Sequence, residues 1–101
     1  MAQILVLYNP PADVAAFDRY YREIHIPLAK RMPGLRSCDI SAAPPQVAAG
    51  NPVHLVARLN FDSLVDIQAA LASPEGQATA ADLANFAQAG VTLLVYDTEA
   101  V

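Results

Sequence analysis

A histidine close to a proline in a helical stretch is the first candidate for chemistry in this chain of 101 residues. His25 follows Tyr21 by four residues, so both side chains project from the same side of a predicted helix. Pro27 has no N–H to donate to the carbonyl of Glu23, so we expect the helix to kink or loosen beside His25. A partly desolvated imidazole is neutral at pH 7 and can accept a proton.

Two interpretations of this stretch are open. In the catalytic one, His25 is a general base, and Tyr21 or Tyr20 donates a hydrogen bond to a substrate oxygen. In the structural one, His25 bonds the freed carbonyl of Glu23 and only fixes the kink. Because a lone histidine is weak evidence of catalysis, composition alone favours the structural interpretation.

The other polar candidates favour structural roles. A charged Arg58 in the middle of an apolar strand needs a partner, and Asp39 on a neighbouring strand is expected to form a buried pair with it. His54 is either a second acid–base or anion-binding group or, as we favour, a polar residue at the rim of an interface or in solvent. Cys38 is the only cysteine and is interpreted as a small apolar filler. Two histidines and one cysteine without ligand spacing predict no metal site.

Composition excludes several classes of protein. The net charge is −4 and the six basic residues are scattered, so nucleic-acid binding is not expected. The longest apolar run, 4–8, is too short to cross a bilayer. The first residues do not resemble a signal peptide, so a cytoplasmic protein is expected. A hydrophobic content of 54% with only 16% charged residues predicts a folded domain with unusually apolar surfaces.

The elements that must position these residues follow from local patterns. Helices are predicted from Asp13 to Pro33-Gly34, from Asp62 or Ser63 to about Leu71, and from the Ser73-Pro74-Glu75 start to before Gly90. Strands are predicted over 2–9, 35–42, 53–61 and 91–98. The order β-α-β-β-α-β predicts an α+β, ferredoxin-like fold in which 1–101 forms a single domain with a four-stranded antiparallel sheet.

The first and last strands are apolar on both faces. In the first strand, Leu5 and Leu7 point to the opposite face from Ile4 and Val6. In the last strand, Leu94 points to the opposite face from Leu93 and Val95. Helices cover only one face, so the other face needs another cover, and a second copy packed sheet to sheet predicts a homodimer. The loop 43–52, with three prolines, is the candidate lid of a pocket.

The motifs of this chain resemble those of the EthD family. They are Tyr20-Tyr21, His25-Ile26-Pro27-Leu28-Ala29, Pro33-Gly34-Leu35 and Ser73-Pro74-Glu75. The resemblance covers nearly the whole chain and implies a dimeric α+β barrel with one pocket between sheet and helices in each subunit. It also implies that His25 points towards that pocket with a tyrosine of the Tyr20-Tyr21 pair beside it. Family members often carry a large aromatic residue after the Ser-Pro-Glu motif, where this chain has Gly76.

Three hypotheses about function follow. The first is an enzyme without metal or organic cofactor that acts on a small apolar cyclic or polyketide-like carbonyl compound, with His25 as base and Tyr21 or Tyr20 polarising the carbonyl. Isomerisation, cyclisation and lactone rearrangement belong here, and a cofactor-free monooxygenase fits the same pocket. Haem-using relatives exist, but no residue here is assigned as an axial ligand. The second is a non-catalytic accessory protein that binds an apolar intermediate, for example of ether or xenobiotic degradation. A purely structural dimer is the third and is disfavoured.

Overall fold

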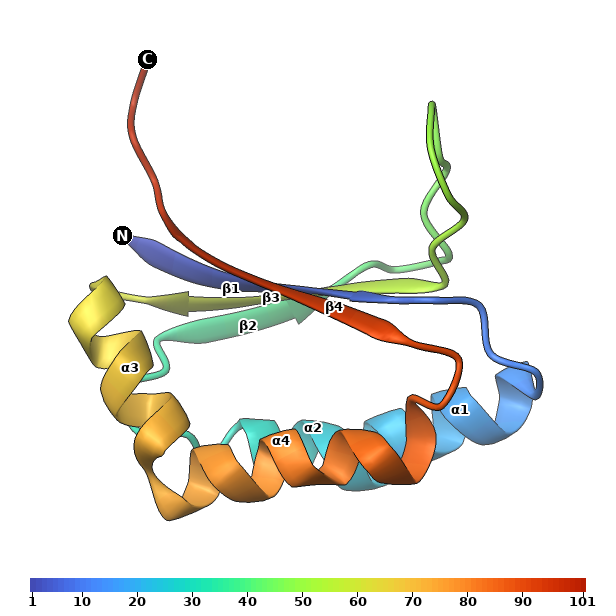
Figure 1. Cartoon of the computed structure of the whole chain (residues 1–101), viewed down its shortest axis with the longest axis horizontal. Helices are drawn as coiled ribbons and strands as arrows, with labels where there is room; N and C mark the ends of the chain where they lie inside the picture. The colour runs from blue at the N-terminus through green and yellow to red at the C-terminus, as the bar shows by residue number, and fades with distance from the viewer.

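One antiparallel sheet carries two rows of helices on a single face (Figure 1). The computed structural model describes all 101 residues. The strands lie in the order β2-β3-β1-β4. Their bounds are β1 Ala2–Tyr8, β2 Ser37–Ile40, β3 Leu55–Phe61 and β4 Val91–Asp97. The helices are α1 Val14–Tyr20, α2 Ile26–Ala29, α3 Leu64–Ala72 and α4 Pro74–Phe86, with a π-helical turn, η1, at Tyr21–His25.

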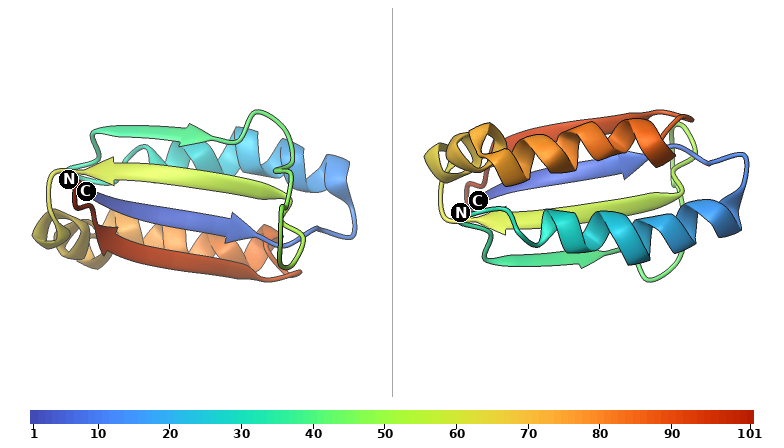
Figure 2. Two further views of the ribbon diagram at one scale, coloured as in Figure 1. Left: turned by 90° about the horizontal axis from the view of Figure 1, so that it is seen from above. Right: turned by 90° about the horizontal axis from the view of Figure 1, so that it is seen from below.

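The predicted ferredoxin-like fold is confirmed, together with the residues that start its helices. The side chain of Asp13 accepts a hydrogen bond from the N–H of Ala16 and begins α1. Ser63, one of two residues predicted to begin α3, accepts from the N–H of Asp66. Ser73 caps α4 with Pro74 at its first turn, as predicted. Helices α1 to α2 and helix α4 lie side by side across the sheet (Figure 2).

The first helix loosens just before Pro27, which is one of the two outcomes expected there. In η1 the N–H of Ile26 donates to the carbonyl of Tyr21, five residues back, so one extra residue is accommodated in the turn. Helix α2 then ends at Ala29, before the predicted end at Pro33-Gly34. No side-chain cap stabilises η1, so its shape depends on Pro27 and on packing.

This turn changes which residues face the sheet. In a regular α-helix, positions four residues apart drift by about 40° around the axis. Here the buried residues follow a spacing of four across the turn, at Phe17, Tyr21, His25 and Ala29. Ile24, one residue before His25, lies off this line, and its side chain is exposed.

The core lies between the sheet and the helices, where four aromatic rings meet. Tyr8 makes edge-to-face contacts with Phe17 and Tyr21, each with ring centroids 5.4 Å apart. Phe86 of α4 packs 5.3 Å from Phe17 and 4.6 Å from the ring of His25. These contacts fix the end of β1, the π turn and the end of α4 relative to one another.

The other face of the sheet is open, and the predicted apolar character of β1 and β4 is found there. Leu5 pairs in register with Leu94, and Leu94 and Tyr96 are exposed. Loop 41–54 and the last residues of the chain both rise from this open face, away from the helices (Figure 1). Loop 43–52 therefore does not cover the helix-side pocket of its own chain, and its expected role as a lid is wrong for this arrangement.

The predicted pair of Arg58 and Asp39 forms across β2 and β3, but on the open face. The two residues are in register and their side chains are 2.8 Å apart. Both side chains are about half exposed in a single chain, so nothing within the chain buries this pair. No helix in the chain has the length and apolar character needed to span a membrane.

Candidate functional site

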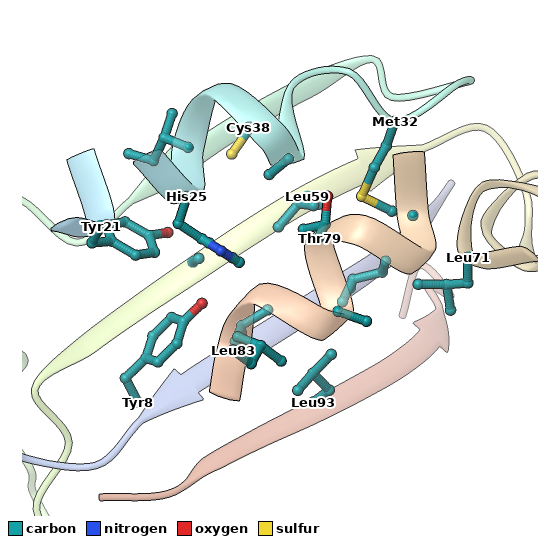
Figure 3. A pocket seen from close by; sticks show the side chains of 17 residues that line it. Tyr8, Tyr21, His25, Met32, Cys38, Leu59, Leu71, Thr79, Leu83 and Leu93 are labelled. Atoms are coloured by element: carbon teal, nitrogen blue, oxygen red, sulfur yellow. The ribbon is translucent and has the colours of Figure 1, made fainter. Parts of the chain in front are cut away.

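A narrow cavity lies between the helices and the sheet, beneath the π turn (Figure 3). Its volume is about 50 Å³, and 14 of its 17 lining residues are hydrophobic. Leu71 near the end of α3 and Leu93 of the edge strand β4 line it yet are exposed, so they mark its opening. Since a cavity of roughly 150 Å³ holds benzene, a ligand with a ring requires these exposed leucines to turn outward.

Three polar side chains converge in this apolar pocket. Tyr8, Tyr21 and His25 are only 2%, 3% and 5% exposed, and the two hydroxyls point towards His25 (Figure 3). No fully enclosed side-chain nitrogen or oxygen lacks a hydrogen-bond partner. The hydroxyls of Tyr8 and Tyr21 and the Nε2 of His25 have no such partner in the chain, so they must be reachable from the cavity. A buried polar group without a partner is costly unless a ligand or water satisfies it.

A buried carboxylate holds the other nitrogen of His25. Asp82 Oδ2 lies 2.9 Å from His25 Nδ1, and Asp82 is itself only 6% exposed. The hydroxyl of Tyr20 donates to Asp82 Oδ1 at 2.5 Å, and the amide of Asn85 donates to the same oxygen at 3.0 Å. The carboxylate of Asp82 is thus bound from three sides by α1, η1 and α4.

The electrostatics of the pair favour a neutral imidazole beside an ionised carboxylate. Burial lowers the pKa of His25, and the hydrogen bond to Asp82 only partly opposes this effect. Burial on its own raises the pKa of Asp82, but hydrogen bonds from Tyr20, Asn85 and His25 outweigh it and hold the pKa below its usual range. Because an ionised carboxylate only accepts, His25 must carry its proton on Nδ1, which leaves Nε2 as a bare acceptor facing the cavity.

The two pocket tyrosines are hydrogen-bond donors at every ordinary pH. Burial raises the pKa of Tyr8 and that of Tyr21 well above the usual value of a phenol. Two neutral O–H donors and one neutral acceptor therefore meet in a cavity with little competing water. This arrangement can donate to a ligand oxygen and accept a proton from a nearby atom.

The structure brings two of the three predicted site residues together and separates the third. His25 and Tyr21 both line the cavity, as expected. Tyr20 does not line it, and its hydroxyl donates to Asp82 from the far side of the pair. His25 also does not bond the carbonyl of Glu23, because Asp82 occupies its Nδ1.

From the sequence alone, no role was assigned to Asp82 or to Tyr8. Asp82 lies in the buried stripe of α4 that also includes Gly76, Thr79 and Phe86. A carboxylate at helical spacing within an apolar stripe needs a buried partner, and this signal was available. Tyr8 is the last residue of β1. Because buried and half-buried residues alternate along this strand, the alternation predicts that the Tyr8 side chain points to the buried side of the sheet.

The remaining candidates lie in other surroundings. His54 bonds Asp18 through Nε2 at 2.8 Å and packs edge-on against Phe17. It therefore contacts α1 and does not line the cavity. Cys38 lines the cavity, and burial raises the pKa of its thiol, which agrees with an apolar filler.

Gly76 lies in the cavity wall for a packing reason. A side chain there would overlap the carbonyl of Ala70 and would come within 2.9 Å of the Cα of Leu71. The close contact of α3 and α4 therefore requires glycine at this position. A large aromatic residue at this position would need a different junction between these helices.

Comparisons with known proteins agree with this architecture. The EthD domain matches residues 9–90. An uncharacterised 11.0 kDa protein in the thcB–thcC intergenic region of Rhodococcus erythropolis is 43% identical over 103 residues, which cover all of this chain and 98% of the relative. A crystal structure of an EthD family protein from Bacillus halodurans C-125 superposes with a TM-score of 0.88 at 28% identity, covering 98% of this chain and 99% of that one.

Two more distant structures share the fold. A dimeric ferredoxin-like protein from Thermobifida fusca YX has a TM-score of 0.70 at 15% identity, over 96% of this chain and 90% of that one. SnoaB of Streptomyces nogalater, a cofactor-independent oxygenase, has a TM-score of 0.66 at 14% identity, over 99% of this chain and 94% of that one. Since the EthD domain spans most of the sequence and a relative with 43% identity spans all of it, the chain belongs to the EthD family.

Proposed function

We propose that this protein is an acid–base catalyst in which His25 removes a proton from a small, mostly apolar carbonyl compound. The observation that carries the proposal is the meeting of one unpartnered acceptor and two unpartnered donors in a buried apolar cavity. No fully enclosed side-chain nitrogen or oxygen of the chain lacks a hydrogen-bond partner, so these three atoms are reachable from the cavity. Three reachable polar atoms in one cavity are the feature expected of a binding or catalytic site.

The chemistry follows from the roles of these atoms. The carbonyl oxygen of the substrate accepts hydrogen bonds from Tyr8 and Tyr21, which draws electron density from the adjacent carbon. His25 Nε2 then takes a proton from that carbon, and the negative charge moves to the oxygen between the two hydroxyls. Return of the proton to another carbon gives isomerisation, while attack by the new nucleophile within the same molecule gives cyclisation or lactone rearrangement.

Asp82 is the positioning residue of this proposal. It keeps the proton of the neutral imidazole on Nδ1, and it stabilises the imidazolium that forms after proton removal. Tyr20 and Asn85 hold Asp82 in turn. Tyr20 thus receives a supporting role in place of the contact with substrate that the sequence suggested.

Two alternatives use the same cavity. In a cofactor-independent oxygenase, the enolate made by His25 would react with O₂, and the shared fold with SnoaB supports including this reaction. In an accessory protein, the three polar atoms would only orient a bound ligand. The small volume of the cavity supports this second alternative, because it leaves little room for a substrate to rearrange.

Hydrogen–deuterium exchange separates catalysis from binding. The wild-type protein and the variants His25→Gln and His54→Gln are incubated in D₂O with small cyclic ketones and lactones, and the loss of the signal of the hydrogens next to the carbonyl is followed by NMR. We expect wild type and His54→Gln to catalyse exchange and His25→Gln to lose about 10²- to 10⁴-fold of the rate. His54 is the matched control because it also bonds an aspartate but lies outside the cavity. Equal rates in all three proteins would refute the catalytic role of His25, and O₂ uptake with the same compounds would identify the oxygenase reaction.

We also propose that the protein is a homodimer formed through the open face of the sheet. Leu5, Leu7 and Val56 lie on this face beside the exposed Leu94 and Tyr96. Four strands about 4.8 Å apart, of four to seven residues each, present a face of roughly 380 Å² in projection. Its apolar middle is as large as the patches that mark interaction sites on other proteins. The dimeric ferredoxin-like protein of T. fusca supports this assembly.

A further inference from the structure

The charges around the cavity restrict the ligands that it can accept. None of the 17 lining residues is a lysine, arginine, aspartate or glutamate. The carboxylate of Asp82, which is negative, lies behind His25. A ligand that brings its own negative charge would therefore be buried without a cation and would be repelled by Asp82.

The cations of the chain are engaged or exposed elsewhere. Arg36 bonds Asp62 and Arg58 bonds Asp39, in each case at the surface. Arg22 lies close to Tyr21 and Lys30 lies close to Cys38, but both are exposed and neither lines the cavity. Arg19 and Arg31 are also exposed and do not line it.

The first turn of α4 does not replace a cation. It contributes Gly76 to the wall, and an unoccupied helix N-terminus favours anions. The N–H of Gly76, however, donates to the hydroxyl of Ser73 at 3.0 Å. This donor is thus already used within the chain, and the donors that remain for a ligand are the hydroxyls of Tyr8 and Tyr21.

We propose that the site takes uncharged, enolisable carbonyl compounds, in keto or enol form, and rejects carboxylates. One ligand oxygen accepts from the hydroxyls of Tyr8 and Tyr21, and the atom that carries the acidic hydrogen lies against His25 Nε2. Charge then arises only as the proton moves, when an enolate and an imidazolium form together above Asp82, so no net charge enters the cavity. This inference rests on the proposed function and narrows its substrate class.

Matched fluorinated probes test the ligand class directly. A phenol mimics an enol because it offers one hydroxyl on an apolar ring. Binding of 4-fluorophenol, 4-fluoroacetophenone and 4-fluorobenzoate at pH 7.5 is measured by ¹⁹F NMR line broadening and shift. We expect the phenol and the ketone to bind and the benzoate to bind at least about tenfold more weakly, because its carboxylate finds no cation.

Tyrosine variants show whether the probe occupies this site. The double variant Tyr8→Phe, Tyr21→Phe should lower the affinity for 4-fluorophenol by about tenfold or more, since two hydrogen bonds are lost. Tyr96→Phe is the matched control, because the hydroxyl of Tyr96 donates to Gln3 on the open face of the sheet. Its affinity should equal that of wild type.

The outcomes separate this inference from the proposed function. If 4-fluorobenzoate binds as tightly as 4-fluorophenol and depends equally on Tyr8 and Tyr21, the substrate class is wrong, even where His25-dependent exchange is observed. If none of the three probes binds, the inference is also refuted. If the neutral probes bind selectively but no exchange depends on His25, the ligand class stands and the catalytic function fails.

Discussion

Replacing Asp82 by asparagine should move the proton of His25 from one ring nitrogen to the other. Tyr20 and Asn85 both donate to Oδ1 of Asp82, at 2.5 and 3.0 Å. In the variant the amide oxygen must occupy this position, because an NH₂ group there would face two donors. The NH₂ group then replaces Oδ2, 2.9 Å from His25 Nδ1. Since two N–H donors cannot bond each other, Nδ1 must become the acceptor and Nε2 must carry the proton.

The effect on activity should be large and the effect on stability small. With its proton on Nε2, His25 has no lone pair facing the cavity, so the contribution of a general base, about 10²- to 10⁴-fold in rate, is lost. The introduced asparagine still makes all three hydrogen bonds of the carboxylate, and only their charge-assisted part disappears. We therefore expect a loss of about 1–2 kcal/mol in the free energy of unfolding.

The assay is ¹⁵N NMR of the imidazole nitrogens at pH 7.5, which distinguishes the two neutral forms without any substrate. His25 in wild type should show a protonated Nδ1, and in Asp82→Asn a protonated Nε2. Asp18→Asn is the control, because Asp18 bonds only the second histidine, His54, at a similar distance. It should alter the signals of His54 and leave those of His25 unchanged. A protonated Nδ1 that persists in Asp82→Asn would refute this account of how the base is held.

Three further predictions concern pH, packing and assembly. Burial lowers the pKa of His25 in the folded state below its ordinary value of 6.5, so as the pH falls the unfolded chain takes up a proton on His25 before the folded chain does. The free energy of unfolding should therefore decrease as the pH drops below about 6.5. Urea titrations at several pH values should show this decrease in wild type and a smaller one in His25→Gln. Gly76→Ala should lower the free energy of unfolding by several kcal/mol in thermal or urea unfolding, because the added methyl group overlaps the backbone carbonyl of Ala70. Ala78→Ser is the control: it also adds one atom, but on the exposed side of α4, and should change the free energy of unfolding little. Leu94→Lys should give a folded monomer in light scattering, while the same charge placed at Gln68 should leave the dimer intact; a dimeric Leu94→Lys protein would contradict pairing through the open face.

Much of the fold could be predicted because its signals are local. The residues Asp13 and Ser73 accept hydrogen bonds from N–H groups three residues away, and nothing distant can change this pattern. The strands follow from alternation and from β-branched residues in the same way. The second strand is shorter than predicted, Ser37–Ile40 instead of 35–42, because the signal at an edge strand is weaker than at a central one.

The candidate site could be predicted only in part because its key contact is not local. His25 and Asp82 are separated by 57 residues, and their pairing depends on how α4 lies against the first helix. From the sequence, the carbonyl of Glu23 was named as a partner of His25 because sequence patterns identify only neighbours along the chain. The carboxylate in the apolar stripe of α4 could have been noticed, but nothing near it in sequence says which residue it bonds.

The π turn explains why this site exists at His25 and not one residue earlier. With regular α-helical rotation, His25 would lie about 40° around the helix axis from Tyr21. The extra residue in η1 reduces the rotation per residue, and the ring of His25 packs 5.6 Å from that of Tyr21. One nitrogen can then reach Asp82 while the other faces the cavity. Pro27 thus acts through the spacing of the helix rather than by breaking it: the residue that cannot donate an N–H favours the wider turn, and the wider turn aligns the base with both of its partners.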